Sequence, residues 1–274
     1  MPDQVVSHQA WRGRPVTDRA SQRAFFGWVG IVFAASVAMT IVWCESMSDM
    51  GEMAMPGGWS MSMTWMRMPG QTWLGAAASF LGMWTVMMVA MMLPSLVPAL
   101  WRYRQAVARK GQSRLGVLTM LAGSGYYLIW TALGLLTFPL GVMLADIEMQ
   151  QPMLSRAVPV TAGVVVLIAG VIQLTSWKAR RLACCRETPS CGRSPQATPA
   201  SAWRYGLRLG LQCSSCCANL MVIPLVLGVM DLSAMAAVAI AVTLERLVPA
   251  SAHVARAMGV AVIGTGLLLI ARAA

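Results

Sequence analysis

The segment WLGAAASFLGMWTVMMVAMMLPSLVPALW, residues 73–101, decides the fold class of this chain because it contains no charged residue. A helix crosses the hydrocarbon core of a bilayer with about 20 apolar residues, and only helices or closed barrels satisfy their backbone groups there. The whole chain is 57% hydrophobic and 11% charged, whereas soluble domains are about 25% charged. The sequence therefore predicts an all-α, polytopic helical membrane protein embedded in a lipid bilayer.

Further apolar runs on both sides of this segment predict about seven transmembrane helices. They form a single membrane domain, 25–272, which follows a basic N-terminal tail, 1–24. Pro94 should kink the helix at 73–101, because the carbonyl of Ala90 loses its helical partner. The expected helices are 25–44, 73–101, 116–144, 157–176, 206–229, 233–249 and 257–272.

The basic residues indicate how the chain is oriented. If the N-terminus is cytoplasmic, only Arg67, Arg156 and Arg272 of the 21 Lys and Arg residues fall on the outer side, which leaves 18 inside. Such a bias is typical of cytoplasmic loops. The net charge of +11 is therefore interpreted as a topology signal, and no nucleic-acid partner is expected. We expect a multi-pass protein of the bacterial inner membrane, with segment 45–72 outside and segment 177–205 in the cytoplasm.

The outer segment, 45–72, is rich in methionine. Thioether sulfur is a soft, neutral ligand that selects Cu(I) among biological metals, and MxxM and MxM spacings let several sulfurs close around one ion. The alternative is that these methionines fill an adaptable apolar surface. The candidate copper ligands are Met47, Met50, Met53, Met55, Met61, Met63, Met66 and Met68.

A second group of methionines follows the faces of the helix at 73–101. One row at i, i+4 and i+8 and a second adjacent row would lie on neighbouring parts of the helix surface. Such a methionine ladder could relay Cu(I) toward the middle of the bilayer, although methionine is also a common apolar filler of membrane helices. The ladder consists of Met83, Met87, Met88, Met91 and Met92.

The third sulfur group is a CxxCC motif at the cytoplasmic start of the helix at 206–229. Its members, Cys213, Cys216 and Cys217, share one helix face, and a helix N-terminus favours the thiolate that binds soft metals. Cys185, or its neighbour Cys184, could add a ligand from segment 177–205, which is expected to be an irregular loop. The alternative is that the cysteines are small apolar residues of a membrane helix.

Polar residues within spans are candidates for function. Glu245 is interpreted as the ion-pair partner of Arg246 or as a residue that reaches the membrane surface, and Gln173 and Asn219 as donors of interhelical hydrogen bonds. The chain has no phosphate-binding loop, and its few acids and histidines do not suggest a hydrolase. The protein is therefore not expected to be an enzyme.

The segment from Trp84 through Met87, Ala90 and Met91 to Pro94 resembles the W..M..AMM.P signature of a bacterial family of predicted metal-binding integral membrane proteins. Two further stretches agree in the same order, so the resemblance covers about residues 80–265. It implies a helical membrane fold and a role in copper handling, often described as that of a copper chaperone. The two stretches contain Ala169, Gly170, Gln173, Leu174, Thr175, Lys178, Cys185 and Arg186, and then Cys213, Cys216, Cys217, Leu220, Met221, Gly228, Met230 and Glu245.

These observations together predict a copper chaperone or importer. It would capture Cu(I) outside, pass it along the methionine ladder, and hold it at the CxxCC motif. Two alternatives stay open: a membrane thiol oxidoreductase that uses CxxCC, and a structural or assembly subunit of a membrane cuproenzyme. The expected partner is a periplasmic copper protein or a membrane cuproenzyme, and a homo-oligomer is compatible with the sequence.

Overall fold

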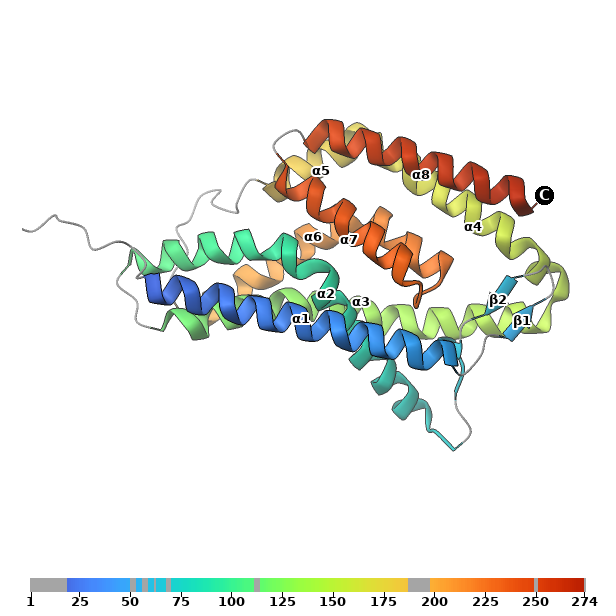
Figure 1. Ribbon diagram of the computed structural model, residues 1–274, viewed down its shortest axis with the longest axis horizontal. Coiled ribbons are helices and arrows are strands. Elements are labelled where there is room, and N and C mark those ends of the chain that lie inside the picture. Colours follow the sequence, from blue (N-terminus) through green and yellow to red (C-terminus); the bar gives the residue numbers. More distant parts are fainter. Residues whose placement is uncertain are drawn as a thin grey trace, which may run out of the picture.

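The protein is a bundle of helices with one short β-hairpin (Figure 1). The computed structural model describes residues 19–49, 53–55, 59–61, 63–67, 70–110, 114–186, 198–248 and 251–273. The predicted all-α membrane class is confirmed. The elements are α1 (Arg19–Asp49), β1 (Met53–Met55), β2 (Trp59–Met61), the 3-10 helix η1 (Met63–Trp65), α2 (Trp73–Ala108), α3 (Leu115–Gln150), α4 (Pro152–Gln173), α5 (Ser176–Arg186), α6 (Pro199–Leu227), α7 (Leu232–Leu247) and α8 (Ser251–Ala273).

Within the described parts of the chain, six helices are long and apolar enough to cross a membrane: α1, α2, α3, α4, α6 and α8. The sequence predicted about seven. The predicted span at 233–249 corresponds to α7, which has 16 residues and is therefore about 24 Å long. This is shorter than the hydrocarbon core of about 30 Å.

Several helices extend well beyond the apolar segments that predicted them. α6 begins at Pro199, where Thr198 forms a capping box with Ser201, seven residues before the predicted start. The expectation of an irregular loop at 177–205 was wrong at both ends, because α5 occupies Ser176–Arg186 and α6 begins at Pro199. Hydropathy reports only the apolar core of a helix, whereas charged turns at its ends remain solvated.

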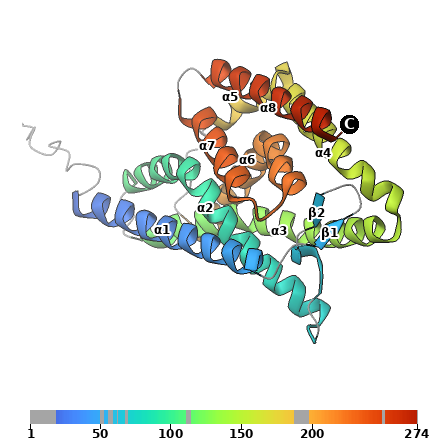
Figure 2. The same ribbon diagram turned by 45° about the vertical axis from the view of Figure 1, so that its right-hand side comes forward.

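The helices lie in three groups. Figures 1 and 2 show the α4–α8 pair on one side, α1, α2 and α3 on the other, and α6 and α7 between them. α3 and α6 approach closely at glycines. A Cβ atom added at Gly206 would lie 2.1 Å from the backbone oxygen of Ala122, so this contact requires glycine. α6 is thereby held in the centre of the bundle, which places its cysteines in the core.

α2 changes direction along its length (Figure 1), and Pro94 and Pro98 lie inside it. Its first half is fixed on α3 by Trp84. The Trp84 indole Nε1 donates a hydrogen bond to the carbonyl of Trp130 at 2.8 Å, and its ring lies where a Cβ atom of Gly134 would be. The methionine ladder is consequently directed into the bundle.

Candidate functional site

The three cysteines of the CxxCC motif lie in the protein core. Cys213, Cys216 and Cys217 are at most 1% exposed, and the Sγ atoms of Cys213 and Cys217 are 3.9 Å apart. The prediction that a helix N-terminus activates them was wrong, because Cys213 lies 14 residues after Pro199, about 21 Å along α6. The helix dipole acts within the first turn, so any electrostatic support for these sulfurs comes from side chains.

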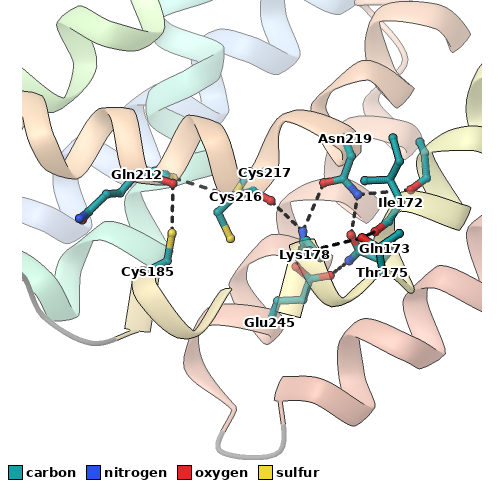
Figure 3. Close-up of polar contacts among 12 residues, drawn as sticks. Ile172, Gln173, Thr175, Lys178, Cys185, Gln212, Cys216, Cys217, Asn219 and Glu245 are labelled. Carbon is teal, nitrogen blue, oxygen red and sulfur yellow. Dashed lines mark hydrogen bonds and ion pairs between the residues drawn. The ribbon is translucent and has the colours of Figure 1, made fainter. Parts of the chain in front are cut away.

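A fourth thiol comes from α5. The Cys185 Sγ donates a hydrogen bond to the backbone oxygen of Gln212 at 3.0 Å, and Figure 3 shows it beside Cys216. The neighbouring Cys216 thiol, together with burial, raises the pKa of the Cys185 thiol. Cys184, in contrast, is exposed. Residues 185, 213, 216 and 217 are hereafter called the thiol cluster.

Two donors are directed at the Cys213 sulfur. The Tyr126 hydroxyl lies 3.0 Å from Cys213 Sγ, and Arg246 Nη1 lies 3.1 Å from it. Arg246 also donates to Ser95 Oγ at 3.1 Å, which fixes its position against α2. A cationic donor and a hydroxyl on one sulfur stabilise negative charge there, as a soft-metal ligand requires.

A buried ion pair adjoins the thiol cluster. Lys178 Nζ lies 3.0 Å from Glu245 Oε2, and both side chains are 1% exposed. Lys178 also donates to the backbone oxygen of Cys216 at 2.8 Å (Figure 3). The expectation that Glu245 pairs with Arg246 was wrong, because these side chains leave α7 in different directions and Arg246 reaches Cys213 instead.

The predicted interhelical hydrogen bonds of Gln173 and Asn219 are confirmed, and they complete this network. Asn219 Nδ2 donates to Gln173 Oε1 at 2.6 Å, and its Oδ1 accepts from Lys178 at 3.3 Å. Gln173 Nε2 donates to Glu245 Oε1. Four helices, α4 to α7, are thus joined by one buried polar network, which fixes α5 and its cysteine against α6.

The methionine ladder is buried as well. Its five residues, all on α2, are at most 7% exposed, and Met88 and Met92 are 0% exposed. Between α2 and α6 lies a void of about 10 Å³, room for about one water-sized atom. It is lined by Trp84, Met87, Met88, Met221, Pro224, Leu225 and Val229.

The outer methionine segment contains more structure than predicted. β1 and β2 pair with Met53 opposite Met61 and Met55 opposite Trp59. Trp59 Nε1 donates to the Ser155 carbonyl at 2.8 Å, and Met55 is buried against Ala145. Of the other candidates, Met47 lies in the last turn of α1, Met63 lies in η1 and Met66 is half-buried, while Met50 and Met68 lie outside the described residues.

Sequence reasoning missed four residues around the sulfurs: Tyr126, Lys178, Arg246 and Met221. Lys178 follows a predicted span and Arg246 lies within one, where charged residues are often functional, and this signal could have identified them. Tyr126 offered none, because its role depends on how α3 packs on α6, and Met221 was named only as part of the family resemblance. Among the described residues, no three or more His, Cys, Asp or Glu side chains have the geometry of a preformed metal site.

Buried thioethers and thiols within a bundle of helices that are long and apolar enough to cross a membrane define a class: a helical membrane protein whose core chemistry suits a soft metal ion. The sequence model of the PpoB2 family, described as a copper chaperone, matches residues 81–269. This is more than half of the chain, and the chain therefore belongs to that family. The match includes the methionine ladder and the thiol cluster and begins after the outer methionine segment. No curated protein matches, and no solved structure does.

Proposed function

We propose that this protein is a copper chaperone of the bacterial inner membrane, with a cytoplasmic N-terminus. It captures Cu(I) with the methionines between Met47 and Met68, relays it along the methionine ladder, and holds it at the thiol cluster. Its metal partner is a periplasmic copper protein or a membrane cuproenzyme. Exposed apolar side chains such as Met120 and Leu136 suit contact with lipid or with a second copy of the chain.

The thiol cluster beside Arg246 carries this proposal. A Cu(I) ion bound by two thiolates has one net negative charge, and the Arg246 guanidinium balances it at 3.1 Å from Cys213 Sγ. The positive charge of Lys178 is already balanced by the carboxylate of Glu245. The buried charges therefore suit a monovalent soft ion, since an unbalanced charge in the core is costly. The family description agrees with this chemistry.

The alternative of a thiol oxidoreductase is less well supported. Disulfide exchange requires a thiolate to reach the sulfur of a substrate, and Cys213, Cys216 and Cys217 are at most 1% exposed. A bare metal ion is small enough to enter such a site from the neighbouring methionines, whereas a protein disulfide is not. Burial thus favours a role in holding or passing metal.

The test is the Cu(I) stoichiometry of the anaerobically purified protein in detergent, by competition with a chromophoric chelator. Cys213→Ser/Cys217→Ser should lose one equivalent of Cu(I). The control Cys184→Ser, which changes an exposed thiol, should lose none. If the double variant binds as much Cu(I) as the wild type, the thiol cluster is not the site.

The methionine ladder is tested separately. Replacing its five methionines by leucine, which conserves volume and is usually tolerated in a core, should lower Cu(I) binding or slow its arrival at the thiol cluster. Met120→Leu is the matched control, because Met120 is 77% exposed. If Cu(I) binding and the loading of the thiol cluster are both unchanged, the ladder methionines only pack the core and do not carry copper.

A further inference from the structure

A second pair of sulfur atoms lies outside both the ladder and the thiol cluster. The Cys44 Sγ of α1 is 3.8 Å from the Met230 Sδ, which belongs to the turn between α6 and α7. Cys44 is 3% exposed, and Met230 is half-buried. The two residues are 186 positions apart in the chain, so the fold rather than local sequence brings them together.

The turn that carries Met230 is fixed at both ends. Gly228 ends α6 with a φ of +135°, a conformation that favours glycine. Asp231 caps α7, and its Oδ1 accepts from the backbone N–H groups of Ser233 at 2.8 Å and Ala234 at 3.1 Å. Met230 therefore lies on a short turn whose backbone is fixed, opposite Cys44. Its sulfur can act as a ligand with little loss of backbone conformational entropy.

The spacing of the two sulfurs suits a shared ion. Metal–sulfur bonds are about 2.3 Å in zinc thiolates, and two such bonds span 3.8 Å when the angle at the metal is about 110°. A larger angle needs only a small outward shift of the Met230 thioether. A thiolate and a thioether together select a soft ion such as Cu(I), or Ag(I) as its mimic.

The pair also adjoins the methionine ladder. Val229, the residue before Met230, lines the void that Met87 and Met88 share with Met221. The turn that carries Met230 therefore borders these thioethers through Val229. On α1, Met47 lies one helical turn beyond Cys44, on the side of the outer methionine segment.

We propose that Cys44 and Met230 form an additional Cu(I) site, which receives the ion from the outer segment and passes it to the methionines around the void. This inference rests on the proposed copper function. It assigns a role to Cys44, which belongs to no sequence motif, and to the turn between α6 and α7.

The test compares Cu(I) stoichiometry in Cys44→Ser, Met230→Leu and the double variant, all as full-length protein in detergent. Each single variant should lose the same one equivalent, and the double variant should lose no more, because both sulfurs hold one ion. Met39→Leu is the matched control on α1, since its side chain is 47% exposed. Full stoichiometry in both single variants would overturn the proposal.

A second measurement needs no variant. Ag(I) should slow alkylation of Cys44 by N-ethylmaleimide at least tenfold, read by mass spectrometry of the Cys44 peptide, and an unchanged rate would overturn the site. The two proposals fail in different ways. If Cys213→Ser/Cys217→Ser loses copper while Cys44→Ser and Met230→Leu bind as the wild type does, the Cys44–Met230 site is refuted and the thiol cluster stands. If only Cys44→Ser and Met230→Leu lose copper, the thiol cluster is refuted and the Cys44–Met230 site stands.

Discussion

Arg246→Gln should weaken Cu(I) binding at the thiol cluster. Full charges separated by 3.1 Å attract by about 5 kcal/mol at an effective dielectric constant of 20. This is an upper bound, because the guanidinium charge is spread over three nitrogens. A hydrogen bond to a charged group contributes about 1.5–3 kcal/mol. The expected loss of affinity is therefore about ten- to a hundredfold.

The assay is anaerobic competition with a chromophoric Cu(I) chelator, with size exclusion in detergent as a check on folding. Arg246→Lys keeps the charge and should retain part of the affinity. Tyr126→Phe removes a hydrogen bond to the same sulfur but no charge, so its loss of affinity should be smaller than that of Arg246→Gln. Arg208→Gln, an exposed position on α6, should bind as the wild type does. Wild-type affinity in Arg246→Gln, together with lost binding in Cys213→Ser, would refute the reasoning.

Two further predictions concern stability, measured by thermal unfolding in detergent. Lys178→Met and Glu245→Gln should each lower the free energy of unfolding by about 3–5 kcal/mol, because the remaining partner loses its counter-charge. The double variant Lys178→Met/Glu245→Gln should lose less than the sum of the two, and additive losses would show that the pair is not coupled. Gly206→Ala should lower the free energy of unfolding by about 1–3 kcal/mol, because the added Cβ meets the Ala122 carbonyl. Gly27→Ala is the control, since open space surrounds Gly27, and it should leave the stability unchanged. Equal losses in the two variants would refute this packing argument.

The spans were predictable because their signal is local. α2 begins at the predicted Trp73, where an apolar run starts after polar residues. The ends were less predictable. α6 extends from Pro199 through Arg204 and Arg208 before its apolar half begins, and a transfer scale reports the apolar part only. α7 was counted as a span although its predicted range, 233–249, is already short for a bilayer, and the helix observed, Leu232–Leu247, has nearly the predicted length.

The site was predictable at the level of residue type and helical face. The i, i+3 and i+4 spacing placed Cys213 near Cys217, and the structure brings their sulfurs to 3.9 Å. The charges around them were not predictable. Adjacent residues on a helix point about 100° apart, so Glu245 and Arg246 meet different partners, Lys178 and Cys213. Such partners come from the packing of α5 and α6, which no local pattern encodes.

The types of sulfur ligand along the proposed route explain how copper is retained in the protein. Thioethers occupy the outer segment and the ladder, with the single thiol of Cys44 beside Met230 between them, whereas four thiols lie together between α5 and α6. A neutral thioether exchanges a soft ion more readily than a thiolate that is supported by a buried cation. In the proposed orientation, Cu(I) therefore moves from weaker ligands outside to stronger ligands inside. Retention then needs no energy source, while release needs an acceptor whose own thiolates compete with Cys213 and its neighbours.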